Sequence, residues 1–365
     1  MAAEVTRRDG RAGRSADLRP WDTQASLKEL ALLADTAGAK VVGYAVQRLE
    51  RPNSATYIGR GKVQEIVSQR SSLGYTTVIF DDELSPSQQR TLEKELEVKV
   101  LDRTALILDI FAQHEDILPR VRGQWSHLER LEGRIGTRGP GETQLETDRR
   151  LIRDRISALK RQIEQVRRQR ALHRRQRARQ GMPVVSLVGY TNAGKSTLMR
   201  TFSGADVLVE DRLFATLDPV TRRVRLPSGN MVLLTDTVGF IQKLPTQLVA
   251  AFRATLEEMT EATLMLHVVD VTHPDAVQQA GTVEATLSEL KLAGKPLLTV
   301  FNKADLLIEG RGDSLEEVLK AEGAQALLEP WGADALVISA AKGWGMEELG
   351  RRLEASLAEA ASAGV

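Results

Sequence analysis

Cysteine is absent from this chain of 365 residues, so disulfide bonds, thiolate zinc sites and cysteine nucleophiles are excluded. No apolar run approaches the roughly 18 residues that a membrane-spanning helix needs. The first 20 residues carry five arginines but no apolar core, and they therefore do not look like a secretory signal. Histidines are few and never spaced as metal ligands, which argues against a zinc site: His114, His127, His173, His267 and His273. We expect a cytoplasmic protein with no membrane span.

The net charge of +1 conceals one strongly basic stretch. Residues 149–180 hold 12 arginines and one lysine against Asp154 and Glu164, a net charge of +11 that leaves −10 on the rest of the chain. One interpretation is a solvated helix that its arginines keep soluble. The other is an electrostatic stripe for the phosphate backbone of a nucleic acid. We favour the second, because an otherwise acidic chain has little other reason to concentrate arginine so heavily.

The N-terminal part has the pattern of a small α/β domain. Residues 1–20 are rich in Arg, Gly and Asp, which predicts a disordered basic tail. Strand-like runs follow at residues 41–46, 76–80 and 99–101. Between the last two, Ser85 is a predicted helix N-cap, with Pro86 in the first turn and Gln88 completing a capping box. We therefore assign residues 21–112 to an α/β domain with a small parallel sheet.

A glycine-rich passage at residues 133–141 precedes a long predicted helix that ends near residue 180. Its apolar residues are spaced by four and three, as in a coiled coil: Ile152, Ile156, Leu159, Ile163 and Val166. At 1.5 Å per residue this helix would be about 50 Å long. Because only one of its faces is apolar, we expect a partner helix around residues 117–131. Residues 113–180 are thus predicted to form a glycine-rich loop and a coiled-coil helical hairpin.

Beyond residue 180, strand-like runs alternate with helical ones. The runs lie at residues 184–188, 232–235, 266–271, 297–301 and 336–339. This rhythm is typical of a doubly wound, mostly parallel sheet with helices on both faces. We assign residues 181–365 to this domain. Its last helix is expected at residues 346–359, with no C-terminal extension after it.

The first of these strands leads into the pattern G-x-x-x-x-G-K-[ST], formed by Gly189, Tyr190, Thr191, Asn192, Ala193, Gly194, Lys195 and Ser196. Glycines let backbone N–H groups wrap around phosphates, and the N-terminus of the following helix adds a positive dipole. Lys195 is expected to reach the β- and γ-phosphates, and the Ser196 hydroxyl to bind Mg²⁺. The pattern predicts a nucleoside triphosphate site after this strand.

A second motif selects the base, and it follows the predicted strand at residues 297–301: Asn302, Lys303, Ala304 and Asp305. The Asp305 carboxylate can accept hydrogen bonds from guanine N1–H and its 2-amino group, whereas adenine offers neither donor. Lys303 would lie over the base, and Asn302 would brace the phosphate loop. A later loop is expected to close over guanine O6 through Ser339, Ala340 and Ala341. GTP is therefore predicted over ATP.

Two further segments are predicted to hold the γ-phosphate and the metal. One consists of Asp236, Thr237, Val238 and Gly239. In it, Asp236 would hold Mg²⁺ through water, and the Gly239 N–H would bond the γ-phosphate. The other consists of Phe214, Ala215, Thr216, Leu217 and Asp218. There Thr216 offers a second hydroxyl to Mg²⁺ on a loop that orders only with the triphosphate, and Thr221 is a weaker candidate for that role.

One side chain that many GTPases use is missing. Phe240 follows Gly239, where such enzymes place the glutamine that orients the attacking water. A phenylalanine cannot do this, so we expect slow intrinsic hydrolysis and another group that organises the water. One hypothesis is that Asn192 binds a K⁺ ion that bridges the phosphates. The alternative, a loop asparagine that bonds its own backbone, stays open.

Together these motifs, with the phosphate loop continued to Thr197, resemble those of the HflX GTPases. The likeness covers the chain from about residue 40 to its end, with further matching motifs at residues 56–62 and 101–107 and the strongest match at residues 136–150. The resemblance implies an N-terminal α/β domain with a coiled-coil hairpin, followed by a Ras-like G domain. It also implies binding to the RNA of the large ribosomal subunit near the peptidyl transferase centre, and splitting or rescue of stalled ribosomes under stress.

The resemblance further implies a Mg²⁺-dependent GTP hydrolase, which we expect to be a monomer that binds GTP and GDP. The expected catalytic residues are Lys195, Thr216 and Gly239, and the expected metal ligands are Ser196, Thr216 and, through water, Asp236. The expected nucleotide contacts are Gly189, Tyr190, Thr191, Asn192, Ala193, Gly194, Lys195, Ser196, Thr197, Phe214, Ala215, Thr216, Leu217, Asp218, Asp236, Thr237, Val238, Gly239, Asn302, Lys303, Ala304, Asp305, Ser339, Ala340 and Ala341.

Two other functions stay open. A GTPase that acts in tRNA modification or ribosome assembly would share the nucleotide motifs, but it would leave residues 136–150 unexplained. An RNA-binding switch, in which GTP only gates affinity, is compatible with Phe240. Stimulation of multiple turnover by ribosomes would separate that switch from the ribosome-dependent enzyme.

Overall fold

The structure is a computed structural model that describes residues 2–5, 23–113, 182–204, 219–241, 259–307, 314–320, 324, 326, 328–332 and 335–362. The chain divides into two compact units, one of Met1–Ile110 together with Pro183–Val365 and the other of Phe111–Met182. The predicted glycine-rich loop and coiled coil lie outside the described residues. Among the residues described, no helix has the length and apolar character needed to cross a membrane.

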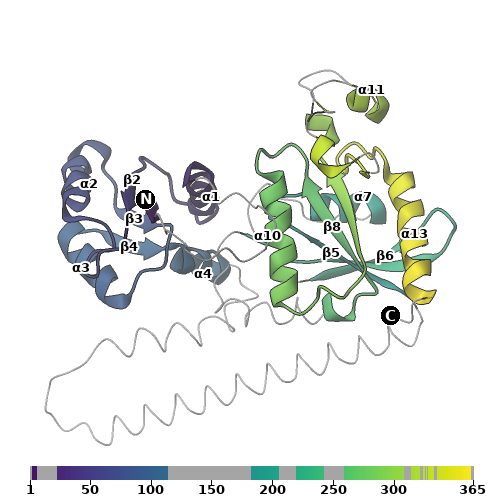
Figure 1. Ribbon diagram of the computed structural model, residues 1–365, viewed down its shortest axis with the longest axis horizontal. Coiled ribbons are helices and arrows are strands. Elements are labelled where there is room, and N and C mark those ends of the chain that lie inside the picture. The colour runs from purple at the N-terminus through teal and green to yellow at the C-terminus, as the bar shows by residue number, and fades with distance from the viewer. Residues whose placement is uncertain are drawn as a thin grey trace, which may run out of the picture. The chain divides into compact units, whose positions relative to one another are not determined.

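The N-terminal part contains two pairs of parallel strands and four helices among its described residues (Figure 1). The elements are β1 (Ala2–Val5), α1 (Thr23–Thr36), β2 (Val46–Leu49), α2 (Arg60–Leu73), β3 (Thr77–Phe80), α3 (Pro86–Leu96), β4 (Lys99–Asp102) and α4 (Arg103–Gln113). Strand β1 pairs with β2, and β3 pairs with β4. The predicted order of strand, helix and parallel strand is confirmed by β3, α3 and β4.

The start of α3 follows directly from its sequence. The Ser85 side chain accepts a hydrogen bond from the Gln88 backbone N–H, and the Gln88 side chain accepts one from the Ser85 backbone N–H. Pro86 occupies the first turn, where its missing N–H has no helical partner to lose. This reciprocal pair is the predicted capping box.

Two N-terminal predictions differ from the structure. The predicted strand at residues 41–46 is wrong, since the strand β2 begins only at Val46. The side chains of Val41, Val42 and Tyr44 are exposed, so this apolar run is not held against a sheet. Ala2–Val5, within the predicted disordered tail, is the strand β1, and its backbone is held by pairing with β2.

The C-terminal part is built on a sheet that has five strands within the described ranges, in the order β6-β7-β5-β8-β9. These are β5 (Val184–Gly189), β6 (Val220–Arg225), β7 (Met231–Asp236), β8 (Leu264–Asp270) and β9 (Leu297–Asn302). Strands β7, β5, β8 and β9 run parallel, and β6 is antiparallel to β7 at the edge. The remaining elements are α7 (Lys195–Ser203), α10 (Ala276–Glu289), the 3₁₀ turn η1 (Ala304–Leu306), α11 (Leu315–Lys320), the 3₁₀ turn η2 (Glu329–Trp331) and α13 (Met346–Ser362).

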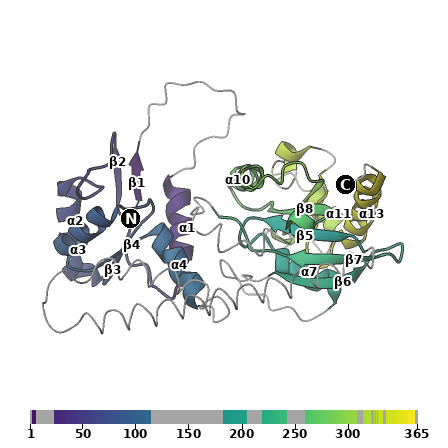
Figure 2. The same ribbon diagram turned by 90° about the horizontal axis from the view of Figure 1, so that it is seen from below.

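Helices cover both faces of this sheet, as Figures 1 and 2 show. Along β8, Leu264, Leu266 and Val268 pack in one cluster with side chains of α7 and α13. The intervening Met265 packs with residues of α10 on the opposite face. This alternation is what a strand buried on both faces requires, and it confirms the predicted doubly wound sheet.

The predicted strand at residues 336–339 is wrong. This segment is not assigned as a strand: it is joined to β9 by an isolated parallel bridge of Val337 with Phe301, around which the Phe301 N–H donates to the Leu336 oxygen and the Ile338 N–H to the Phe301 oxygen. Strand β6, in contrast, was not predicted, because its three arginines leave no apolar run to recognise. The last helix is found where it was expected, although it continues to Ser362.

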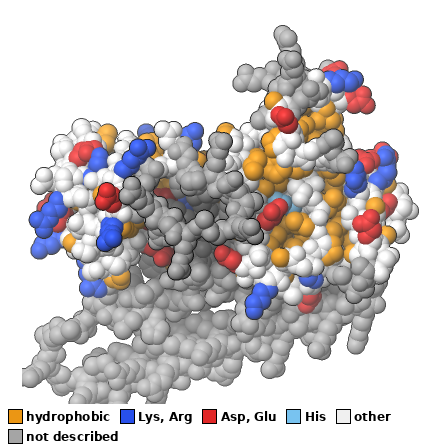
Figure 3. Space-filling view, viewed as in Figure 1, with side chains coloured by type: hydrophobic (Ala, Val, Ile, Leu, Met, Phe, Trp, Pro, Cys, Tyr) orange, Lys and Arg blue, Asp and Glu red, His pale blue; other side chains and the backbone are white. Residues whose placement is uncertain are grey.

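Figure 3 shows one face of the molecule in space-filling form. Lysine, arginine, aspartate and glutamate side chains of both signs are interspersed on the described residues of this face. Hydrophobic side chains gather over the C-terminal part. The described residues therefore present no large basic patch on this face.

Candidate nucleotide-binding site

The phosphate loop begins where β5 ends, and two glycines are needed there because other backbone and side-chain atoms lie very close. A Cβ at Gly189 would lie 2.3 Å from the backbone oxygen of Val268 on the neighbouring strand β8. A Cβ at Gly194, where φ is +92°, would lie 2.2 Å from the Asn302 Nδ2. A side chain at either position would force the loop away from the sheet. The two fixed glycines of the pattern therefore have a structural reason in this fold.

Lys195, the first residue of α7, lies folded against the loop that precedes it. Its Nζ donates to the backbone oxygens of Gly189 at 3.1 Å and Tyr190 at 2.8 Å. Burial lowers the pKa of Lys195 to about 8, while the charge of Asp236 raises it and that of Lys303 lowers it. The ammonium group is thus held at the loop by carbonyl oxygens, in a place where an anionic ligand would stabilise its charge.

Two of the three predicted metal residues come together from α7 and β7. The Ser196 Oγ donates a hydrogen bond of 2.6 Å to the Asp236 Oδ2, and Asp236 is buried at the end of β7. A hydroxyl and a carboxylate are oxygen ligands of the kind that Mg²⁺ prefers, and this ion takes its remaining ligands from phosphates and water. Among the residues that the structure describes, no group of three His, Cys, Asp or Glu side chains could hold a metal by itself. The donor set thus fits a phosphate-bound Mg²⁺.

The segment after β7 packs directly on the phosphate loop. The Thr191 N–H donates to the Phe240 backbone oxygen at 2.8 Å, and the Phe240 N–H donates to the Gly189 oxygen at 3.0 Å. A Cβ at Gly239 would lie only 2.7 Å from the Thr191 Cα. The Thr237 hydroxyl donates to the backbone oxygen of Leu187 within β5. Residues 236–240 and the phosphate loop are therefore one closely packed structure.

At the other end of the site, Asn302 connects three segments. Its Nδ2 donates to the Ala193 backbone oxygen at 2.9 Å, and its Oδ1 accepts from the Ala340 backbone N–H at 2.9 Å. The Asp305 Oδ1 accepts a hydrogen bond of 2.6 Å from the Ser339 hydroxyl. Lys303 forms an ion pair of 2.8 Å with Asp270, the last residue of β8. The carboxylate and lysine expected at the base are thus each fixed by a partner.

Family models match residues 24–177 and 184–303 of the chain. Residues 24–112 match the model of the GTP-binding GTPase N-terminal family, residues 110–177 match its middle-region model, and residues 184–303 match a model described as 50S ribosome-binding GTPase. The GTPase HflX of Alkalihalophilus pseudofirmus is 52% identical over 295 residues, which cover 77% of this chain and 70% of that protein. The GTPase HflX of Caldanaerobacter subterraneus is 46% identical over 345 residues, covering 89% and 81%.

The chain belongs to the HflX family of GTPases. It has the mixed α/β architecture with a G domain that this family implies, and it is a GTP hydrolase. A solved GTP-binding protein of Sulfolobus solfataricus in complex with GDP is 23% identical over 91% of this chain and 95% of that one, with a TM-score of 0.43. Dependence on Mg²⁺ is general in GTPases of this kind. When bound, the ion supplies positive charge that offsets the charge developing between the β- and γ-phosphates.

Some predicted residues of this HflX-family site are not placed. Phe214, Ala215, Thr216, Leu217 and Asp218 lie outside the described residues, so the structure does not test them. Thr221, the weaker candidate for the metal, lies in β6, and its hydroxyl is 3.0 Å from that of Thr235 in β7. That pairing makes Thr221 part of the sheet rather than of a loop that orders with the triphosphate.

Two buried residues of the site have clear physical roles that the motifs do not state. Phe240 is buried beside Tyr190 in the apolar cluster that includes Val188 and Met265. Burial, with a further contribution from Lys195, lowers the pKa of His267 in β8 to about 4, so this side chain is neutral at physiological pH. In this HflX-family chain, Phe240 therefore anchors the segment that follows β7, and His267 adds no charge to the sheet beneath the phosphate loop.

Proposed function

We propose that this GTPase binds the large ribosomal subunit and that GTP hydrolysis times a cycle of ribosome splitting or rescue under stress. The observation that carries the proposal is the match of residues 184–303 to the model described as 50S ribosome-binding GTPase. The net charge of +11 at residues 149–180 supports it, since such a stretch attracts the phosphate backbone of ribosomal RNA. We expect this GTPase to act as a cytoplasmic monomer that is bound to ribosomes for part of its cycle.

The roles at the nucleotide follow from the contacts described above. Lys195 would exchange its carbonyl partners for the β- and γ-phosphates, and Ser196 would turn from Asp236 to the metal, which Asp236 then holds through water. Thr216 would be the second hydroxyl ligand, and the Gly239 N–H would bond the γ-phosphate. Catalysis is then mainly electrostatic, because these groups stabilise charge that grows in the transition state.

Guanine would be recognised by the residues around Asn302. The Asp305 carboxylate offers its second oxygen to the base, while Ser339 holds the first. Lys303 would cover one face of the ring. The backbone of Ala340 and Ala341 would approach guanine O6, in a loop that Asn302 already bonds to the phosphate loop.

The attacking water needs a group that Phe240 cannot supply, since its ring is buried in the core. We propose that the bound ribosome, or a backbone group that the ribosome positions, orients this water. A K⁺ ion held by Asn192 would assist, because Asn192 is exposed within the loop at φ +59°. Hydrolysis should then be faster in K⁺ than in Na⁺ at equal ionic strength, and equal rates would contradict the K⁺ site.

The test of the main proposal is GTP hydrolysis in Mg²⁺ and K⁺ with no ribosomes, with purified small subunits and with purified large subunits. We expect stimulation of at least tenfold by large subunits alone. Small subunits are the matched control, because they offer comparable RNA charge without the proposed binding site. Equal stimulation by both subunits would contradict a specific large-subunit partner.

The burial of Phe240 favours one second candidate, an RNA-binding switch in which GTP gates affinity and turnover is incidental. That function predicts tight, GTP-dependent binding to large subunits without stimulated turnover. Observing this combination would replace the ribosome-dependent enzyme by the switch. A role in ribosome assembly or tRNA modification would instead give preferential binding to precursor particles or tRNA.

A further inference from the structure

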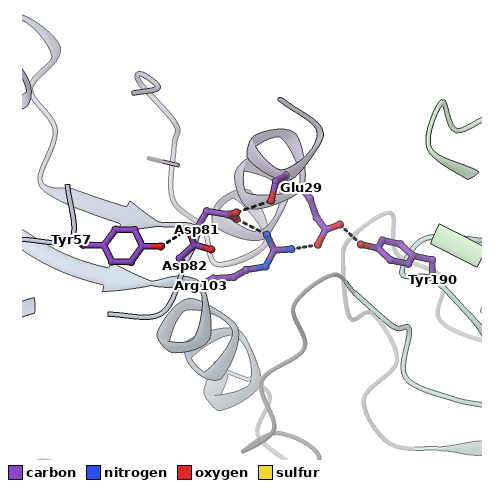
Figure 4. Close-up of polar contacts among 7 residues, drawn as sticks. Glu29, Tyr57, Asp81, Asp82, Arg103 and Tyr190 are labelled. Atoms are coloured by element: carbon purple, nitrogen blue, oxygen red, sulfur yellow. Dashed lines mark hydrogen bonds and ion pairs between the residues drawn. The ribbon is translucent and has the colours of Figure 1, made fainter. Parts of the chain in front are cut away.

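A cluster of charged side chains is buried in the N-terminal part, and none of the charged residues is among the predicted nucleotide contacts (Figure 4). Arg103, the first residue of α4, is 2% exposed and forms ion pairs with Glu29 of α1 and Asp81, which follows β3. The Arg103 Nη1 lies 2.7 Å from the Asp81 Oδ1, and the Ser26 hydroxyl donates to the other Asp81 oxygen at 2.6 Å. Such a cluster fixes the geometry of its members, because each of them would be costly to bury alone.

The phosphate loop contributes a further member to this cluster. The Tyr190 hydroxyl donates a hydrogen bond to the Glu29 Oε2, while the Glu29 Oε1 accepts from the Arg103 Nη2 (Figure 4). Glu29 and Tyr190 are separated by 161 positions in the sequence but belong to the same compact unit. The contact therefore joins helix α1 directly to the residue that follows Gly189.

Tyr190 is also held at its backbone by the catalytic machinery. Its carbonyl oxygen accepts from the Lys195 Nζ at 2.8 Å, and it forms a bridge with Phe240 after β7. When Lys195 turns toward the phosphates of a nucleotide, the hydrogen bonding of the Tyr190 carbonyl changes. One residue thus connects the lysine, the segment at 236–240 and helix α1.

Packing alone does not explain the hydroxyl of Tyr190. Its ring lies in the apolar cluster with Phe240, and a phenylalanine would fill the same volume. The side chain is only 4% exposed, so bulk water cannot serve the hydroxyl, and a buried tyrosine hydroxyl needs a partner. That partner is the carboxylate of Glu29.

We propose that Tyr190 is a positioning residue which couples helix α1 to the phosphate loop. Through the Glu29 contact, the state of the N-terminal part influences how firmly the loop holds nucleotide. Because such coupling is reciprocal, nucleotide binding also changes the stability of α1. The coupling acts in the protein by itself and does not require the ribosome, so it can be tested independently of the proposed function.

The test uses the full chain without ribosomes and three variants: Tyr190→Phe, Glu29→Gln and the double variant. Tyr190→Phe removes the hydrogen bond, and we expect it to weaken binding of fluorescent GDP roughly fivefold or more. Glu29→Gln removes the charge of the acceptor and should weaken GDP binding by less. The double variant should bind GDP no more weakly than Tyr190→Phe, because both changes act on one contact. Hydrogen exchange of residues 23–36 should slow on GDP binding in the native protein and no longer respond to GDP in the variants.

Tyr57→Phe is the matched control, since the Tyr57 hydroxyl also donates to a carboxylate, that of Asp82, at 2.8 Å and remote from the phosphate loop. This variant should keep the native GDP affinity and the native response of α1. Native affinity and a native exchange response in Tyr190→Phe would overturn the proposal. Full additivity of the two single effects would overturn it as well. If thermal unfolding shows that Tyr190→Phe does not fold, Glu29→Gln provides the test instead, with a smaller expected loss of GDP affinity and of the exchange response.

Discussion

At the scale of single residues, Lys195 makes nucleotide binding sensitive to pH. Burial lowers the pKa of its ammonium group to about 8 in the free protein. Nucleotide phosphates favour the charged form, so the pKa rises on binding and the lysine takes up a proton. At pH 8 about half of the free molecules carry a neutral lysine, and GDP binding should take up about half a proton. Affinity should fall as the pH rises above 8, by at most about tenfold per unit.

Calorimetry of GDP binding at pH 8, in buffers of different ionisation enthalpy, measures this uptake directly. The phosphates themselves are already ionised at that pH. Lys195→Arg is the control, because a guanidinium stays protonated throughout. Proton uptake on GDP binding should therefore vanish in this variant, even if the variant binds GDP weakly. The same uptake in both proteins would assign the proton to another group.

The residues of the site show what the sequence could and could not predict. The phosphate loop, Asp236, Asn302 and Asp305 lie at or just after the C-terminal ends of the parallel strands β5, β7 and β9, so their motifs were enough to predict that they meet. The hydrogen bond of Tyr190 to Glu29 could not be predicted from the sequence, because no sequence motif contains both residues. These two residues are separated by 161 positions in the sequence, and only folding brings them into contact.

At the scale of elements, the contact between the segment after β7 and the phosphate loop leaves no room for a methyl group at Gly239. In Gly239→Ala the Cβ would lie 2.7 Å from the Thr191 Cα and 3.0 Å from the Lys195 Nζ. Because the Thr191 backbone cannot move away without strain, the substitution should displace the segment and lower the free energy of unfolding by about 1–3 kcal/mol. Because this glycine is predicted to bond the γ-phosphate, GTP hydrolysis should fall far more than GDP affinity.

Gly61→Ala is the matched control for that variant. Nothing lies within 4 Å of a Cβ built at Gly61, which is exposed near the start of α2. Here alanine should leave hydrolysis unchanged and stabilise the protein by up to about 1 kcal/mol in urea unfolding. If GDP affinity and GTP hydrolysis fall equally in Gly239→Ala, the substitution has disturbed the whole loop and not the γ-phosphate contact.

Strands of the C-terminal sheet could be predicted from the sequence where their burial requires a continuous run of apolar residues. Strands β5, β7 and β8 are largely buried and β9 is buried in its second half, and each was predicted to within about two residues at either end. Strand β6 has exposed arginines at 222, 223 and 225 around a single buried Val224, so as an edge strand it gave no such run. The segment at residues 336–339 is apolar but pairs with β9 through a single bridge, since the extent of that pairing depends on backbone geometry that composition does not encode.

At the scale of the whole molecule, the segregation of charge should control binding to RNA. Residues 149–180 carry +11 while the rest of the chain carries −10. The acidic remainder repels phosphate, so attraction must come from the basic stretch. Replacing Arg167 and Arg168 by glutamine removes two of its charges, and the slope of log K against log salt for binding to large subunits should decrease by about one to two.

The control removes the same charge elsewhere. Arg222 and Arg225 are exposed on strand β6, and their replacement by glutamine should leave the salt slope unchanged and lower affinity only slightly. Affinity measured by co-sedimentation at four or more salt concentrations gives both slopes. Equal changes of the salt slope in the two variants would mean that binding to the large subunit depends on the overall charge of the protein and not on the stretch at residues 149–180. An unchanged slope in both would remove the electrostatic support for ribosome binding, and the proposed function would then rest on the family model alone.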